Sequence, residues 1–228
     1  MAAHLLVRSH SSTSVSALCK PLLYPWIMSV TSLYIATSNP GKLRDFAHAA
    51  RSFPNVEILP LPNVASIPAP EEDANTFAGN ALIKALAYSA IATGKIVLAD
   101  DSGIAMRGLN GTPGVRSARY ADDEAFTHQG TTDERNVACL LDRAASLRYK
   151  DVSYLCALAA VRDGTLLATG AGELQGRLID TQRGTDGFGY DSVFEIPELG
   201  QTMAEVDHDT RLVISHRGRA LVDLLNKL

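Results

Sequence analysis

The sequence predicts an α/β fold built on a mixed β-sheet. Strand-like apolar segments alternate with helical patterns in the first half of the chain, and a hairpin of two longer strands follows in the second half. The chain has 228 residues, of which 46% are apolar and 20% charged, as in an ordinary globular protein. This length supports one domain, or one domain with two lobes around a cleft.

Three strand-like segments lie in the first half of the chain. They are short and apolar, they are bounded by turn residues, and they cover residues 33–37, 56–61 and 96–99. We expect the third strand to end at Ala99, immediately before an acidic pair. Helical patterns over residues 42–52 and 76–93 follow the first two strands, and Asn75 or Thr76 is the expected cap of the second helix.

The second half predicts two more helices, a hairpin and a later strand. A nearly continuous apolar segment returns after the turn Asp163-Gly164, which is typical of a hairpin of central strands. A polar, glycine-rich loop follows the hairpin. The expected bounds are 132–147 for a helix capped by Thr132, 152–161 and 165–173 for the hairpin strands, 190–194 for the later strand and 215–225 for the last helix.

The first 30 residues differ in composition from the rest. They contain Arg8, Lys20 and many serines but no acidic residue, which resembles a transit peptide. The alternative, a start codon assigned too early, is favoured because Met28 stands just before the first strand. We therefore expect residues 1–30 to be an extension outside the fold and residues 31–228 to form the domain.

Charge and cysteine content exclude several classes of protein. A net charge of −4 is a poor match for a nucleic acid polymer, and no apolar run is long enough to span a membrane. The three cysteines are odd in number and lack a Cys-x-x-Cys pair, which favours reduced thiols and a cytoplasmic location. The six histidines form no His-x-x-x-His pair, so a zinc site has little support.

The first motif with chemical potential is Thr37-Ser38-Asn39-Pro40-Gly41-Lys42. A strand ends there, small polar residues turn the chain, and a helix begins with a lysine. Exposed amides at a helix N-terminus together with an ammonium group suit a polyphosphate. The motif is not a Walker loop, because only one glycine precedes Lys42. Taken alone, such a hexapeptide is more often an ordinary capped turn between a strand and a helix.

Acidic residues form the second candidate. Glu71, Glu72 and Asp73 lie in a loop before a helix, and Asp100 and Asp101 follow an apolar strand. Solvated loop charge is the better interpretation for Glu71 and Asp73. An acid pair at the carboxyl end of a buried strand lies where α/β sheets place ligands. Carboxylates without histidine or cysteine suit Mg²⁺, which would bridge the protein and substrate phosphates.

Two further segments could contact a base. In Gly187-Phe188-Gly189-Tyr190-Asp191 two glycines flank an aromatic ring, which could stack on a base or could equally belong to the core. In Ser215-His216-Arg217 an arginine lies at the start of a helix, where the helix dipole disfavours positive charge. That position favours an anion or a base edge as its partner, and ordinary surface charge is the alternative.

Together, in this order and spacing, these segments resemble the inosine triphosphate pyrophosphatase family, which acts on non-standard purine nucleoside triphosphates. The resemblance covers about residues 33–227, and the joint order of its segments is highly specific. The segments are 36–42, Glu72 with Thr76-Phe77, Asn80-Ala81, Lys84-Ala85, 99–103, Pro113-Gly114-Val115, 117–120, 187–191 and 214–217.

The resemblance implies a role for each matched residue. Mg²⁺ would be bound by Glu72 and Asp101, and Asp101 would also accept a proton. The residues implied to meet the triphosphate are Thr37, Ser38, Asn39, Pro40, Gly41, Lys42 and Lys84. The residues implied to contact other parts of the substrate are Ser102, Phe188, Gly189, Tyr190, Asp191, Arg211, His216 and Arg217.

Four positions depart from the family pattern. Asp45 stands where glutamate is frequent, Gly79 where glutamate often precedes the Asn-Ala pair, and Ser192 where proline is common. Arg211 stands where lysine is usual, which keeps the charge but changes its geometry. None of these departures removes a residue assigned to the chemistry.

The resemblance also implies a fold and an activity. We expect an elongated mixed β-sheet flanked by helices, two lobes around a central substrate cleft, and a homodimer. The expected reaction is Mg²⁺-dependent hydrolysis of ITP, dITP or XTP to the nucleoside monophosphate and pyrophosphate. A pyrimidine nucleotide pyrophosphatase is disfavoured, because its Ser-x-Arg-Arg turn is missing. A non-catalytic nucleotide-binding module is disfavoured because Lys42, Glu72 and Asp101 are all present.

Overall fold

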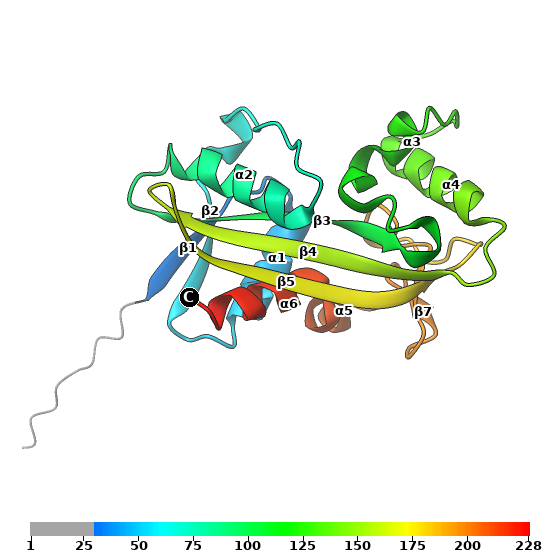
Figure 1. The fold of residues 1–228 in the computed structure, drawn as a ribbon. Helices are drawn as coiled ribbons and strands as arrows, with labels where there is room; N and C mark the ends of the chain where they lie inside the picture. The colour runs from blue at the N-terminus through cyan, green and yellow to red at the C-terminus, as the bar shows by residue number, and fades with distance from the viewer. Residues whose placement is uncertain (1–29) are drawn as a thin grey trace, which may run out of the picture.

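The computed structural model describes residues 30–228, and it confirms an α/β fold with a mixed, elongated sheet flanked by helices (Figure 1). Across these residues the sheet has seven strands in the order β2-β1-β3-β4-β5-β6-β7. β1 is parallel to β2 and β3, and the other neighbours are antiparallel. The strands are β1 (Thr31–Ile35), β2 (Val56–Pro60), β3 (Ile96–Met106), β4 (Asp151–Arg162), β5 (Thr165–Leu178), β6 (Phe194–Ile196) and β7 (Gln201–Thr202).

Helices cover both faces of this sheet (Figure 1). α1, α5 and α6 lie on one face, and α2 lies on the other. Farther along the strands, buried side chains of α3 and α4 join the apolar cluster of Ile104, Met106 and Tyr154, whose side chains share the face covered by α6. The helices are α1 (Pro40–Ala50), α2 (Phe77–Ser89), α3 (Tyr120–Asp123), α4 (Thr132–Ala144), α5 (His208–Ile214) and α6 (His216–Leu225). The extension expected at residues 1–30 lies outside the described residues except for Val30, and the arrangement in two lobes stays a prediction.

The two faces of the sheet are packed differently. Large apolar side chains such as Phe46 of α1 and Leu221 of α6 are fully buried against β1, β3 and β4 on one face. On the other face, small side chains such as Ala81 and Ala85 of α2 pack against alanines of β3 and β4. Because alanine has so small a side chain, α2 can approach the sheet closely.

Several predicted boundaries were wrong. β3 does not end at Ala99 but continues to Met106, because it pairs with β4 along that whole length, and this pairing overrides the low strand preference of aspartate. The strand expected at residues 190–194 begins only at Phe194, since the amides of Val193 and Phe194 donate to the Tyr190 carbonyl in a turn. The cap of α4 is Thr131, not Thr132.

The other elements lie at their expected places, but β5 runs past its expected end at residue 173 to Leu178, and α2 ends at Ser89, before its expected end at residue 93. The hairpin turns at Asp163 and Gly164, both with positive φ, and Thr76 caps α2. The last helix begins after the cap Ser215, as expected. α1 begins at Pro40, two residues before the expected start, because proline suits the first turn of a helix.

α6 lies directly on β5, and glycine makes this contact possible. A Cβ at Gly172 would lie 2.1 Å from the carbonyl oxygen of His216, and one at Gly170 would lie 2.2 Å from that of Ala220. Real Cβ atoms do not approach a carbonyl oxygen so closely. The first turn of α6, which carries His216 and Arg217, can therefore lie this close to β5 only because glycine has no side chain.

We predict that Gly172→Ala lowers the free energy of unfolding by about 1–3 kcal/mol, because the added methyl group forces α6 away from the sheet. Urea denaturation followed by circular dichroism measures this change. Ala171→Ser is the matched control, since Ala171 is the exposed neighbour on the same strand. Equal stability of Gly172→Ala and the control would contradict the close approach.

Candidate active site

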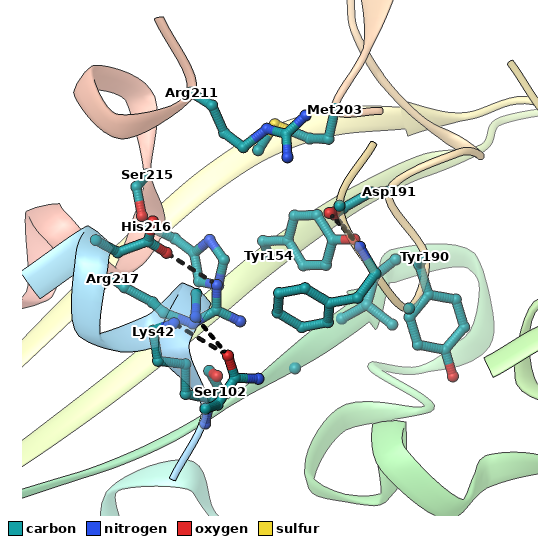
Figure 2. Close-up of a pocket in the computed structure, with 18 of the residues that line it drawn as sticks. Lys42, Ser102, Tyr154, Tyr190, Asp191, Met203, Arg211, Ser215, His216 and Arg217 are labelled. Carbon is teal, nitrogen blue, oxygen red and sulfur yellow. Dashed lines mark hydrogen bonds and ion pairs between the residues drawn. The ribbon is translucent and has the colours of Figure 1, made fainter. Parts of the chain in front are cut away.

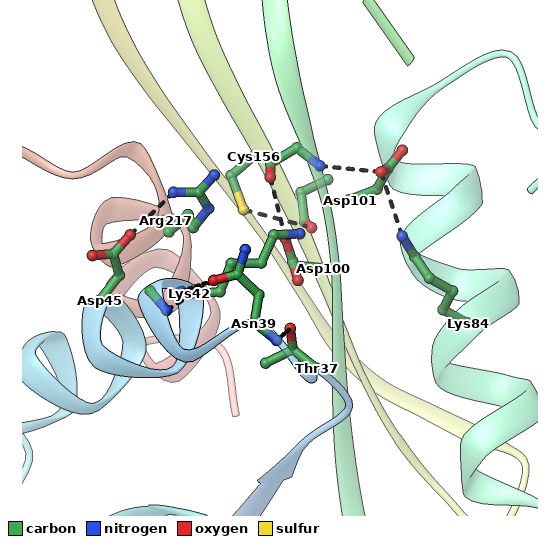
Figure 3. A network of polar contacts seen from close by, with 12 residues as sticks. Thr37, Asn39, Lys42, Asp45, Lys84, Asp100, Asp101, Cys156 and Arg217 are labelled. Carbon is green, nitrogen blue, oxygen red and sulfur yellow. Dashed lines mark hydrogen bonds and ion pairs between the residues drawn. The ribbon is translucent and has the colours of Figure 1, made fainter. Parts of the chain in front are cut away.

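Asp100 and Asp101 lie in the middle of β3, and their side chains point to opposite faces of the sheet (Figure 3). Side chains alternate along a strand, so Asp100 shares a face with Leu98 and Asp101 shares the other face with Ala99. The prediction that these acids form a pair at the end of a strand was therefore wrong. The two carboxylates belong to two different groups of side chains, one on each face.

Asp100 meets positive charge on the face covered by α1 and α6. Lys42 Nζ of α1 donates to Asp100 Oδ2 at 2.7 Å, and Ser102 Oγ donates to the same oxygen at 3.3 Å. Burial opposes charge on Asp100, but the cations of Lys42 and Arg217 outweigh it and hold the pKa of this carboxyl below its ordinary value. Asp100 is therefore a buried, ionised partner of the lysine of the first motif.

Asp101 belongs to a second group on the face covered by α2. Lys84 Nζ of α2 lies 2.7 Å from Glu72 Oε2 and 3.4 Å from Asp101 Oδ1. The Asn80 amide donates to Asp101 Oδ2 at 3.0 Å, and its oxygen accepts from the Ala74 amide. Burial raises the pKa of Asp101, although Lys84 and Asn80 oppose the rise.

Glu72 and Asp101 offer oxygen ligands of the kind that Mg²⁺ prefers. Both carboxylates converge on a single ammonium group, so two negative charges face one positive charge. Within residues 30–228, no cluster of three or more His, Cys, Asp or Glu side chains could hold a metal. Magnesium does not need such a cluster, because it is often held by one or two carboxylates together with phosphates and water. As expected, Glu71 and Asp73 are exposed.

The start of α1 does not offer free amides, contrary to the expectation from sequence. Asn39 caps the helix, and its Oδ1 accepts from the amides of Gly41 at 2.8 Å and Lys42 at 3.2 Å. Pro40 has no amide hydrogen, and Thr37 Oγ1 accepts from the Asn39 amide. The cation of this segment is therefore the Lys42 side chain, and the capped turn serves to place it.

A cavity of about 640 Å³ opens beside Lys42 (Figure 2). Its walls come from α1, β3, β4, α4, α5, α6 and the loop before β6. Its size is within the usual range for sites that bind small molecules. The predicted site residues that line it are Asn39, Pro40, Gly41, Lys42, Ser102, Phe188, Gly189, Tyr190, Asp191, Arg211, His216 and Arg217.

The loop that carries Phe188 presents the ring to the cavity. Of the two interpretations from the sequence, a ring that could stack on a base or a core aromatic, this position agrees with the first. The Phe188 side chain is 46% exposed, so it is not a core aromatic. Its amide donates to Asp191 Oδ2 at 3.1 Å, and the Gly189 amide donates to Asp133 Oδ2 at 2.9 Å. Two carboxylates thus hold the backbone of the loop at Phe188 and at the residue after it.

The first turn of α6 brings a neutral imidazole and a cation to the same cavity. His216 is 3% exposed, and burial, helped by the nearby Arg217, lowers its pKa well below the ordinary value. Arg217 donates to Asp45 Oδ2 at 3.1 Å, and its guanidinium carbon lies 5.3 Å from the centre of the Phe188 ring. Asp45 therefore balances the charge that the helix dipole disfavours.

The amino-acid sequence matches a known family along almost the whole described chain. The sequence profile of the Ham1 family covers residues 33–227. This chain belongs to the Ham1 family. The match runs from β1 to the last turn of α6, so it includes every residue of the two carboxylate groups and of the cavity wall.

Curated relatives and solved structures of the Ham1 family cover this chain well. A protein of Acidobacterium capsulatum named dITP/XTP pyrophosphatase is 49% identical over 86% of this chain and 98% of its own. One of the same name from Geobacter sulfurreducens is 42% identical over 87% of this chain and 97% of its own. The solved structure of a HAM1 protein from Coxiella burnetii has a TM-score of 0.71 and 34% identity, covering 84% of this chain and 95% of that one.

The other predicted site residues of this Ham1-family chain do not line the cavity. Thr37 and Ser38 form the turn before α1, and Glu72, Lys84 and Asp101 lie on the other face of β3.

Cys139 and Cys156 are buried free thiols, and Cys19 lies outside the described residues. None of the helices in residues 30–228 is both long and apolar enough to cross a bilayer.

Sequence reasoning missed several residues of the cavity wall. Tyr154 of β4, Met203, Asp133 and Asn136 of α4, and Arg44 of α1 all line the cavity. Arg44 and Asp133 resemble ordinary helix surface charges in the sequence. Tyr154 stands in an apolar strand, where an aromatic residue predicts a core position. Asp45 also lines the cavity, and the sequence drew attention to it only as a departure from the family pattern.

Proposed function

We propose that this chain hydrolyses non-standard purine nucleoside triphosphates such as ITP, dITP and XTP to the nucleoside monophosphate and pyrophosphate. One observation carries the proposal: β3 separates a cavity lined by Lys42, Arg217 and an exposed aromatic ring from a pair of carboxylates at Glu72 and Asp101. The names of the relatives from Acidobacterium capsulatum and Geobacter sulfurreducens support the same substrate class.

Charge balance supports a triphosphate bound together with Mg²⁺. In the structure Lys42 neutralises Asp100, whereas Lys84 alone faces both Glu72 and Asp101 and leaves one negative charge unbalanced. A triphosphate would draw Lys42 and Lys84 toward its oxygens and leave the carboxylates free for a cation. Glu72 and Asp101 would hold that Mg²⁺, which supplies neutralisation of phosphate charge and orients the leaving group.

The reaction needs one general base and no covalent intermediate. A water oxygen attacks the α-phosphorus, the bond to the bridging oxygen breaks, and pyrophosphate leaves. Asp101 accepts the proton of the attacking water, because the Asn80 amide and Lys84 hold its carboxylate in a fixed orientation. Lys42 and Lys84 stabilise the charge that grows on the pyrophosphate.

Base selection is assigned to the start of α6. Inosine and xanthosine carry an acceptor oxygen at position 6, whereas adenosine carries an amino donor there. Arg217 is a permanent donor in the cavity wall, and its Nε has no partner among the described residues. A buried donor that faces another donor is costly, so such a site rejects adenine. Phe188 would stack on any purine.

The first experiment measures pyrophosphate release from ITP, XTP, ATP, GTP and dUTP, with and without Mg²⁺. We expect ITP and XTP to be preferred and activity to disappear with a chelator. Preference for dUTP would instead support a pyrimidine pyrophosphatase, and binding without release would indicate a nucleotide-binding module. Size-exclusion chromatography with light scattering of the same sample tests the homodimer that the family resemblance implies.

Asp101→Asn is expected to lower kcat at saturating Mg²⁺ by at least about 10²-fold, because the amide cannot accept the proton of water. Thermal unfolding of the variant should stay close to that of the wild type. Asp180→Asn is the control, since Asp180 forms only a surface ion pair with Lys150. Substantial turnover by Asp101→Asn would refute its role as the base.

Arg217→Ala is expected to lower the ratio of kcat/KM for ITP to that for ATP by about tenfold or more, because the donor that meets the position-6 oxygen is lost. Phe188→Ala should weaken all purines evenly, by about 1–3 kcal/mol of stacking. Arg219→Ala, an exposed arginine on the same helix, is the control. An unchanged ratio in Arg217→Ala would place base selection elsewhere.

A further inference from the structure

Tyr154 lies at the centre of the sheet and reaches the floor of the cavity (Figure 2). It belongs to β4, where it stands opposite Ile104 of β3 and Leu174 of β5. The residue is 7% exposed, and strands on both sides fix its backbone. Its side chain therefore has a fixed position from which it can orient its neighbours.

The hydroxyl group of Tyr154 holds the loop that carries Phe188. It donates to Asp191 Oδ1 at 2.8 Å, while Asp191 Oδ2 accepts from the Phe188 amide at 3.1 Å. The loop is closed tightly around this carboxylate, since a Cβ at Gly187 would lie 2.1 Å from Asp191 Oδ2. The position of the Phe188 backbone thus depends on the carboxylate that Tyr154 orients.

The ring of Tyr154 holds the imidazole of His216. The two rings are stacked with centroids 4.9 Å apart and an interplanar angle of 13°, and Phe194 stacks at 4.3 Å from Tyr154. Neither ring nitrogen of His216 has a hydrogen-bond partner among the described residues. With no polar contact to orient it, the imidazole takes its plane from the stack.

We propose that Tyr154 is the positioning residue of the base pocket, with its hydroxyl group setting the Phe188 platform through Asp191 and its ring setting the plane of His216. This inference rests on the proposed function, because it assigns the cavity beside Phe188 and His216 to the purine base. It adds one residue to that site, and that residue acts through two others and need not touch the substrate.

Two substitutions separate the two actions of Tyr154. Tyr154→Phe removes only the hydroxyl group. KM for ITP and for ATP should both rise about tenfold with kcat little changed, because one hydrogen bond to a carboxylate is lost. Tyr154→Leu also removes the ring, so it should in addition lower the preference for ITP over ATP by about fivefold or more. Tyr120→Phe is the control, another buried tyrosine outside the cavity wall.

Hydrogen exchange without nucleotide tests the same inference independently of activity. In Tyr154→Phe the Phe188 amide should exchange about tenfold faster, because its acceptor is no longer oriented. The Ile179 amide, which donates to the Val193 carbonyl, should exchange as in the wild type, and Tyr120→Phe should leave both unchanged.

The outcomes distinguish this inference from the proposed function. If the wild type released no pyrophosphate from any purine triphosphate but Phe188 exchange still rose in Tyr154→Phe, the function would fail and the positioning role would stand. Wild-type exchange at Phe188 together with a wild-type KM in Tyr154→Phe would overturn the role of Tyr154. If Tyr154→Leu fails to fold, Tyr154→Phe alone decides.

Discussion

Successive side chains of a β-strand point to opposite faces of its sheet, and in β3 this alternation separates two adjacent carboxylates. Asp100 faces α1 and α6, and Asp101 faces α2 (Figure 3). A one-residue shift in the register of β3 against β4 would exchange the two faces and mismatch every contact that these acids make. The long ladder between β3 and β4, which fixes that register, is therefore the constraint on which the site depends.

Each carboxylate on β3 is matched by a lysine from the helix that covers its face. Lys42 comes from the first turn of α1, and Lys84 comes from the middle of α2. Unpaired buried charge is very unfavourable, so these pairs explain how acids can stand in the centre of a sheet. Under the proposed function, both lysines would exchange these carboxylates for phosphate oxygens when a triphosphate and Mg²⁺ bind.

The wall of the cavity depends on packing remote from it. α6 carries His216 and Arg217, and its position depends on the absence of side chains at Gly170 and Gly172 of β5. Tyr154, on the neighbouring strand, orients both an imidazole and the loop of Phe188. The strands thus act as the rigid frame, and the helix ends and the loop hold the polar groups.

The amino-acid sequence by itself determined the fold class, most of the helices and the hairpin, and it singled out Lys42, Phe188 and Arg217, which the structure places in one cavity wall. Those features depend on local patterns: apolar runs, caps, turn residues and the order of short motifs. Only the tertiary structure decided that β3 continues through the acids, that Asp100 and Asp101 part to opposite faces, and that Asn39 uses the amides at the start of α1. Strand pairing, cap geometry and ring stacking join residues far apart in the chain or depend on exact backbone angles. A linear pattern carries no signal for such contacts, so Tyr154 could be recognised only once its neighbours were in place.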